Sequence, residues 1–187
     1  NRQRLLTQAW EKWLHSTGVE HDYVYDIRAI LSRQIPDFEL RTELEIEVFV
    51  KWVKKNHLTD PTGLAHLLWL CKSKTAIINA IQHCRLEKFE SQQAIIIQNE
   101  FPNPIDGHFT ILSGSCDIVV FPPESLHLLR IHALVKIHNM DEVNNILNEG
   151  TIINTLHGPS GFGELSSLTN VKRAASVRAS KGSSAEL

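Results

Sequence analysis

A glycine-rich turn near the carboxyl end of this sequence combines residue types that suit a phosphate. Segment 158–168 reads GPSGFGELSSL, and segment 172–177 reads KRAASV. Gly161 and Gly163 have no Cβ, so backbone N–H groups at this turn can approach a phosphate closely. Residues 164–169 can form a short helix whose N-terminus faces the same anion. The pattern predicts a cradle for a phosphate group.

Two oppositely charged side chains flank the expected short helix. Arg173 carries a permanent positive charge on a planar fork that suits two phosphate oxygens. Glu164 stands nine residues earlier, and its carboxylate only accepts hydrogen bonds, so it fits a ribose hydroxyl and repels a bare phosphate. This spacing suits a nucleotide whose sugar and phosphate lie close together.

These two blocks resemble the phosphate-binding cassette of cyclic nucleotide-binding domains, in both order and spacing. The likeness is carried by FGEL at 162–165 and RAASV at 173–177. It extends upstream to FTILSGS at 109–115 and to LEKF at 86–89, followed by III at 95–97. The run IINTLH at 152–157 is similar to the cAMP-regulated exchange factors for Rap-type GTPases. The resemblance covers about residues 62–187.

The resemblance implies a role for each cassette residue. Glu164 would bind the ribose 2′-OH, and Arg173 would bind the cyclic phosphate. Family members that prefer cGMP often carry Thr directly after the arginine, to meet the guanine amino group. Ala174 stands there, so the resemblance favours cAMP, with cGMP as the other candidate. Backbone amides of Gly163, Leu165 and Ala174 would complete the phosphate shell. The expected ligand-binding set is Gly163, Glu164, Leu165, Arg173, Ala174 and Ala175.

A regulatory module without catalytic activity is the function that the resemblance implies. Ligand binding would tighten the short helix and pass a shift to helices before and after the roll. An effector domain or partner protein outside this chain would receive the signal; an exchange factor and a kinase regulatory subunit both remain open. The alternative is a structural or interaction domain that keeps the fold without the ligand. We expect Leu165 and Leu168 to pack in the core, where they can also relay the cassette's movement.

The first half of the chain has the periodicity of amphipathic helices. Thr42 can cap one helix with Glu45 at the capping-box position, and that helix should run to about His57. Asp60-Pro61-Thr62 is a second start signal. The predicted helices cover residues 2–15, 23–34, 43–57, 64–70 and 74–83.

From residue 85 onward, short strand-like runs alternate with turn residues. We expect strands near 86–89, 94–97, 109–112 and 116–121, and a short helix at 140–147 that Gly150 ends. Asn99 replaces the family's usual glycine before the aromatic strand, and asparagine tolerates the left-handed conformation that the turn needs. Segment 125–149 is longer than the family's usual connection.

The expected fold is therefore α+β, with a helical segment followed by an antiparallel β-roll. We divide the chain into a helical N-terminal region, 1–60, and a cyclic nucleotide-binding domain, 61–187. That domain comprises helices at 61–84 and the roll at 85–187. The resemblance implies that the roll is incomplete at Leu187. The lid helices that cap the base in the family would then be absent from this chain.

Composition argues against several other classes. The net charge is −2 with interleaved signs, which gives no footprint for nucleic acid or an anionic membrane. No apolar run reaches the roughly 18 residues of a membrane span, and no signal-peptide pattern follows Asn1. Three cysteines without C-x-x-C spacing indicate buried thiols in a reducing, cytoplasmic setting. The ten histidines are dispersed, so we expect no metal and no cofactor.

Two further sequence features have a structural interpretation. Segment 172–176, KRAAS, resembles a basophilic kinase site, but Ser176 would lie in a paired strand and could not readily enter a kinase cleft. Four tryptophans stand on the helical stripes, and we expect them to pack between helices. They are Trp10, Trp13, Trp52 and Trp69.

Overall fold

Helices precede antiparallel strands in this protein, which confirms the predicted α+β class. The computed structural model describes residues 42–58, 64–71, 73–102 and 107–187. It begins with α3 (Glu43–Asn56), α4 (Leu64–Cys71) and α5 (Lys74–His83). The predicted helices at 2–15 and 23–34, the start signal at 60–62, and Trp10 and Trp13 lie outside the described residues. The division at residue 60 stays a prediction.

Helix α3 begins with the predicted capping box. The Glu45 backbone N–H donates to Thr42 Oγ1 at 3.3 Å, and the Thr42 backbone N–H donates to Glu45 Oε2 at 2.6 Å. These two bonds satisfy donors that the first helical turn leaves without partners. The helix ends at Asn56 with His57 as its C-cap, within one residue of the predicted end.

The three leading helices share one apolar core. Phe49 and Trp52 are buried and meet edge to face, with their ring centroids 5.9 Å apart. Leu112, which follows strand β3, packs against this cluster and links it to the strands. The expectation that tryptophans pack between helices is confirmed for Trp52. Trp69 on α4 is partly exposed and stacks on His57, the residue that caps the end of α3.

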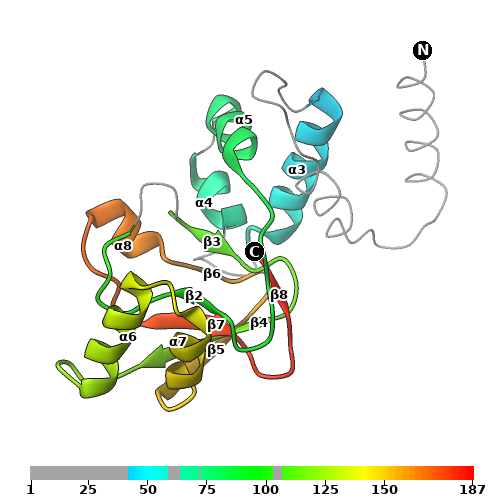
Figure 1. Cartoon of the computed structure of the whole chain (residues 1–187). Helices are drawn as coiled ribbons and strands as arrows, with labels where there is room; N and C mark the ends of the chain where they lie inside the picture. Colours follow the sequence, from blue (N-terminus) through cyan, green and yellow to red (C-terminus); the bar gives the residue numbers. More distant parts are fainter. Residues whose placement is uncertain (1–41, 59–63, 72, 103–106) are drawn as a thin grey trace.

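Every strand pair in the described part of the chain is antiparallel, and Figure 1 shows these pairs below the three leading helices. One short pair joins β1 (Lys88–Phe89) to β8 (Ala185–Glu186). Another joins β3 (Phe109–Thr110) to β6 (Gly161–Phe162). The largest sheet has the order β2-β7-β4-β5. Its strands are Ala94–Ile96, Ser176–Ala179, Ser115–Val120 and Thr151–His157.

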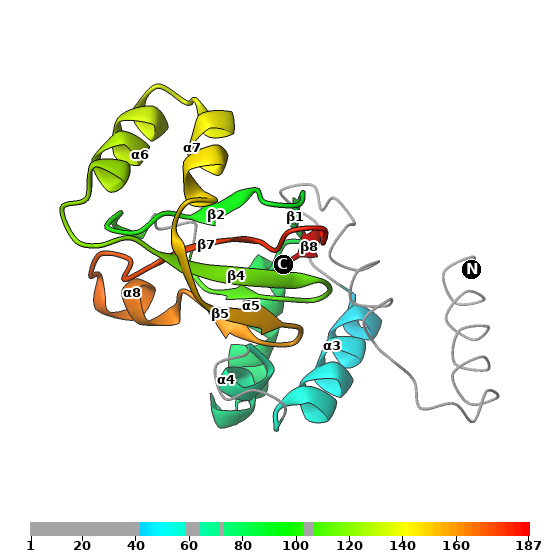
Figure 2. The ribbon, with the colours of Figure 1, turned by 90° about the horizontal axis from the view of Figure 1, so that it is seen from below.

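The four-stranded sheet buries apolar side chains on both faces. On one face, Cys116, Val177 and Ala179 pack with Ile111 and Phe162 from the neighbouring strands. On the other, the sheet packs against α6 (Leu126–Lys136) and α7 (Met140–Leu147). Figure 2 shows α6 and α7 on one side of the sheet and the leading helices on the other.

Helix α7 was predicted from the sequence, whereas α6 was not recognised as a helix. Leu128 and Ile131 of α6 are buried against the sheet, yet Leu126 and Leu129 of the same helix are exposed. Apolar residues on opposite faces blur the one-sided stripe that identifies an amphipathic helix. The start signal was present, because Ser125 caps α6 by accepting a hydrogen bond from the Leu128 N–H.

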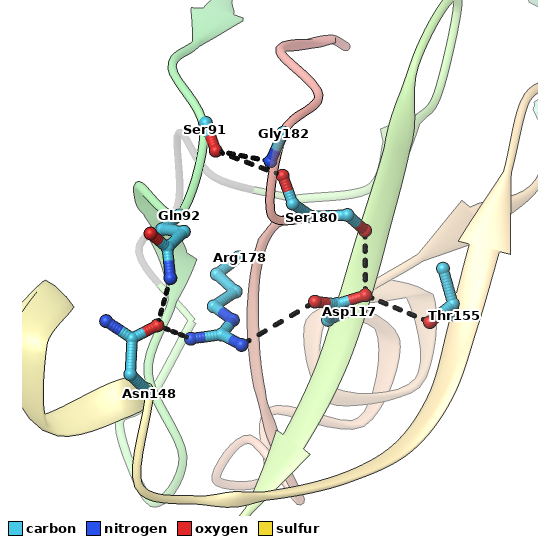
Figure 3. Close-up of polar contacts among 8 residues, drawn as sticks. All are labelled: Ser91, Gln92, Asp117, Asn148, Thr155, Arg178, Ser180 and Gly182. Atoms are coloured by element: carbon cyan, nitrogen blue, oxygen red, sulfur yellow. Dashed lines mark hydrogen bonds and ion pairs between the residues drawn. The ribbon is translucent and has the colours of Figure 1, made fainter.

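A buried polar cluster fastens the end of α7 to the sheet (Figure 3). Arg178 on β7 donates from Nη1 to Asn148 Oδ1 and forms an ion pair with Asp117 on β4, at 3.7 Å. Asp117 Oδ1 also accepts from Thr155 Oγ1 at 2.9 Å and from Ser180 Oγ at 2.7 Å. Four elements are thereby joined around one buried charge pair, although Arg178 Nε has no acceptor.

Two other side chains clarify interpretations made from the sequence. Ser176 is fully buried in β7 and its Oγ accepts from the Gln98 N–H at 2.9 Å, so it is inaccessible to a kinase. Burial raises the pKa of the Cys116 thiol to about 12, which fits a small apolar core residue. None of the helices among the described residues is long and apolar enough to cross a bilayer.

Candidate functional site

The predicted short helix is α8 (Glu164–Thr169), and it begins at a glycine that the geometry requires. Gly163 is the N-cap with φ 89° and ψ −8°, the left-handed region. A Cβ at this position would lie 2.9 Å from Arg173 Nη1 and 3.2 Å from the Gly107 carbonyl oxygen. The missing side chain therefore lets the arginine reach the start of the helix.

Arg173 lies in the loop between α8 and β7, and its backbone is held by the turn at Asn99. The Asn99 N–H donates to the Arg173 carbonyl, and the Arg173 N–H donates to the Glu100 carbonyl, both at 2.8 Å. Asn99 adopts φ 66°, which confirms that asparagine can form this turn in place of glycine. Two backbone bonds thus set the direction in which the arginine side chain leaves the chain.

The guanidinium of Arg173 returns to the start of α8. Only 4% of this residue is exposed. Its Nη1 donates to the Gly163 carbonyl at 2.6 Å and to Ser166 Oγ at 2.5 Å, with a longer contact to Ser167 Oγ at 3.4 Å. These three acceptors, from the part of the chain that the structure describes, are neutral, and two of them are hydroxyl groups that can rotate.

Several hydrogen-bond donors lie within 3.3 Å of the Gly163 carbonyl oxygen. Besides Arg173 Nη1, it faces Ser166 Oγ at 3.2 Å, Ser167 Oγ at 2.9 Å and the Ser167 N–H at 3.3 Å. A carbonyl oxygen has two lone pairs. Even when the single hydroxyl proton of Ser167 goes to the Gly107 carbonyl, three donors face this oxygen. The start of α8 therefore holds a surplus of donors, which is the property that an anion site needs.

Glu164, the acidic residue at this turn, has an acceptor that lacks a hydrogen-bond donor. Glu164 Oε2 is buried and has no hydrogen-bond partner. Leaving a buried acceptor without a donor costs about 1–3 kcal/mol, and more for a charged group. A ligand hydroxyl would remove this cost. The site thus combines an excess of hydrogen-bond donors around Gly163 with a buried acceptor, one residue away, that has no donor.

Strands β3 and β6 form the base of the site. Phe109 pairs with Phe162 in register, and their rings stack with centroids 5.2 Å apart. The carbonyl of Gly107, just before β3, accepts a hydrogen bond from Ser167 Oγ. The turn of β6 into α8 is therefore tied to the chain that enters β3.

The remaining residues of the expected ligand-binding set lie around the same turn. Ala174 is exposed and Ala175 is half-buried, both directly after Arg173. The expectation that Leu165 and Leu168 pack in the core is wrong, since they are 65% and 81% exposed. Helix α8 has six residues and buries the side that carries Ser166, so its leucines face outward.

Sequence reasoning did not assign a role to Ser166 and Ser167. A signal for them existed in their spacing, because serines three and four residues after a helix N-cap can bond back to the carbonyl of that cap residue. Both do so here, on Gly163. Neither position carries a charge, so only the folded arrangement reveals that Ser166 also meets the arginine.

A carboxylate and an imidazole lie behind the turn that holds Arg173. His132 Nδ1 on α6 is 4.0 Å from Glu100 Oε1. Burial raises the pKa of Glu100, and the nearby His132 offsets part of that effect. Within the described ranges, no three His, Cys, Asp or Glu residues are grouped so as to hold a metal ion.

Comparisons with known proteins find a likeness among solved structures. No family model matches the chain, and no curated protein does. Among solved structures, the chain is similar to the regulatory domain of Toxoplasma gondii PKA in a co-crystal with cAMP, with 15% sequence identity and a TM-score of 0.49. The likeness covers 75% of this chain and 40% of that one, so this chain spans less than half of the matched protein's length.

Proposed function

We propose that the protein is a regulatory module that binds a cyclic nucleotide, with cAMP preferred over cGMP. The observation that carries this proposal is the mismatch of hydrogen-bond donors and acceptors at the start of α8. Donors exceed acceptors around Gly163, and the Glu164 carboxylate has a buried oxygen without a donor. A cyclic nucleotide supplies an anionic phosphate and a free 2′-hydroxyl a few ångströms apart. One ligand would therefore give the donors around Gly163 an acceptor and give the Glu164 carboxylate a donor.

Arg173 is the residue proposed to neutralise the phosphate. A guanidinium forms short, charge-assisted bonds to phosphate oxygens, and these are roughly twice as strong as bonds between neutral groups. The phosphate would therefore add strong anionic acceptors to a guanidinium that Gly163 and Ser166 already hold in place through Nη1. Because Arg173 is buried, this contact would form where solvent screens the charges weakly.

Glu164 is the residue proposed to recognise the sugar. Its carboxylate accepts hydrogen bonds only, so it favours a hydroxyl and disfavours a second phosphate in the same place. This arrangement supports binding of a cyclic 3′,5′-phosphate, which leaves the 2′-OH free. The preference for cAMP is supported by Ala174, which offers no side-chain hydroxyl to a guanine amino group.

The output of the module is proposed to involve the outer side of α8. Leu165 and Leu168 are large apolar residues left exposed on the helix that contacts the ligand site. A ligand moves an equilibrium only by its differential affinity for two states. A helix or partner protein that covers these leucines in one state alone would provide that difference, and such an effector would lie outside the described residues.

A second candidate function is a structural or interaction domain that binds no nucleotide. One observation favours it, since the Gly163 carbonyl and Ser166 hydroxyl already give Arg173 Nη1 two short bonds. A fold that had lost its ligand would gain from such internal acceptors. The buried oxygen of Glu164 without a partner argues against it, because a purely structural site has no reason to keep that cost.

Calorimetric titration of the purified protein with cAMP and with cGMP tests the proposal. We expect saturable heat with one site per chain, and tighter binding of cAMP than of cGMP. The absence of heat with both nucleotides at high micromolar concentration would favour the structural alternative. Tighter binding of cGMP would retain the module and overturn the assignment of Ala174.

A further inference from the structure

We propose that Ser166 is a positioning residue that fixes the Arg173 guanidinium for the phosphate before ligand arrives. This inference rests on the proposed function and adds a residue that the sequence pattern did not assign. Ser166 is buried on the inner side of α8, and its Oγ lies 2.5 Å from Arg173 Nη1. The other two acceptors described for that nitrogen are farther away, at 2.6 and 3.4 Å.

The hydroxyl of Ser166 bridges the arginine and the helix start. It accepts from Arg173 Nη1 and donates to the Gly163 carbonyl at 3.2 Å. Arg173 Nη1 also reaches that carbonyl directly at 2.6 Å. The three groups form a closed triangle, in which the guanidinium cannot rotate without breaking two bonds. A side chain with several rotatable bonds loses much conformational entropy when it is fixed, and here that loss occurs on folding rather than on binding.

Geometry distinguishes Ser166 from its neighbour Ser167. The Ser167 hydroxyl lies 3.4 Å from Arg173 Nη1 and bonds to the carbonyls of Gly163 and Gly107. Ser167 therefore ties α8 to the chain before β3, and its contact with the arginine is weak. The two serines share a helix and a side-chain type but differ in their role, and substitution can separate these roles.

Ser166→Ala removes the hydroxyl and keeps the helix-compatible backbone. We expect cAMP affinity to fall about tenfold, the order expected for one lost hydrogen bond to a charged group. Ser166→Thr retains a hydroxyl and should restore most of the affinity. Thr169→Ala is the matched control, because Thr169 Oγ1 bonds back to the Leu165 carbonyl on the same helix and is exposed. That variant should bind cAMP like the parent.

A double-mutant cycle tests whether Ser166 acts through Arg173. In an Arg173→Ala background, Ser166→Ala should change the affinity by less than about twofold, because the group that it positions is gone. Weak affinities in this background can be measured by NMR titration at millimolar cAMP. A tenfold loss that persists without Arg173 would overturn the positioning role.

A ligand-free measurement keeps this inference separate from the proposed function. The guanidinium N–H signals of Arg173, assigned by their loss in Arg173→Ala, should be resolved and slow to exchange in the parent. They should broaden in Ser166→Ala and remain sharp in Thr169→Ala. Unchanged signals in Ser166→Ala would overturn the inference even if cAMP binds. Broadened signals would support the positioning of the arginine even if no cyclic nucleotide binds, in which case only the proposed function fails.

Discussion

Two arginines five residues apart, Arg173 and Arg178, are each only 4% exposed but meet different kinds of partner. Arg178 forms an ion pair with the buried carboxylate of Asp117 and a hydrogen bond with Asn148. Arg173 directs Nη1 to a backbone carbonyl and to the hydroxyl of Ser166. Burial is the same in both cases, so burial alone does not separate a structural arginine from one that we propose to bind a ligand.

The two arginines differ in the charge of their described partners and in how firmly those partners are held. The acid beside Arg178 is on the adjacent strand and is itself held by two hydroxyl donors, so an incoming anion would have to displace a fixed charge. The described acceptors of Arg173 Nη1 are neutral groups, which form weaker bonds than a phosphate would. The Arg178 cluster therefore holds the strands and α7 together, whereas the Arg173 cluster is proposed to accept an additional anionic partner.

Asp117→Ala should have the largest effect, on stability. It removes the acid beside Arg178 and leaves a buried charge without compensation, for which the expected loss is about 3–5 kcal/mol. Urea unfolding followed by circular dichroism measures this change. At temperatures where the variant is folded, its cAMP affinity should stay within a few-fold of the parent. A stable variant that has lost cAMP binding would reverse the roles given to the two arginines.

Arg173→Ala should have the next largest effect, on ligand affinity. Loss of the phosphate contact should weaken cAMP binding at least about 100-fold, equivalent to about 2.7 kcal/mol. Its unfolding free energy should fall less than that of Asp117→Ala, because the serine hydroxyls can still bond to Gly163. Arg130→Ala provides a matched control, since Arg130 is exposed and pairs with Glu142 on α7. Equal affinities of both variants, measured by calorimetry, would remove Arg173 from the site.

Gly163→Ala and Gly182→Ala should have smaller effects, and comparing their cAMP affinities tests the close approach of Arg173 to Gly163. Both glycines have positive φ, 89° and 76°, so each substitution should cost about 1–2 kcal/mol of stability through backbone strain. A Cβ at 163 would also press on Arg173 Nη1, whereas a Cβ at 182 would have no atom within 4 Å. Only Gly163→Ala should therefore weaken cAMP binding. Equal affinity of the two variants would show that the arginine does not depend on this close approach.

Glu100→Gln should have the smallest effect, and it depends on pH. Burial raises the pKa of Glu100, so the ionised carboxylate disfavours the folded state at neutral pH, and this penalty disappears as the folded protein takes up a proton. Glu100→Gln should be slightly more stable than the parent at neutral pH, with the difference narrowing as pH falls toward 4.5, the ordinary value. Thermal unfolding across this range measures it. A difference that widens on acidification would contradict the sign.

Local patterns in the sequence predicted the short helix and the residues at its start, because these residues are close along the chain. Gly163, Glu164 and Arg173 lie at the same helix start, as their spacing implied, and the capping box at Thr42 formed as expected. Each of these features depends on contacts within about ten residues. Glycine, acid and arginine at fixed offsets therefore suffice to locate the candidate site.

Features that depend on distant contacts were not predictable from one sequence. The pairing of Asp117 with Arg178 joins adjacent strands whose residues are far apart in the chain. The outward orientation of Leu165 and Leu168 depends on which side of α8 packs against the strands. Helix α6 escaped recognition because apolar residues occupy opposite faces. In each case the deciding information is which surface a segment meets after folding.

The central claim is that one ligand spans Arg173 and Glu164, and a calorimetric comparison of cAMP with 2′-deoxy-cAMP tests it most directly. The parent protein should bind cAMP about tenfold more tightly than the 2′-deoxy analogue, because only cAMP gives the buried Glu164 Oε2 a donor. In Glu164→Ala, which removes the acceptor, this preference should fall to within about twofold. The same tenfold preference in both proteins, or no binding of either nucleotide by the parent, would contradict the account.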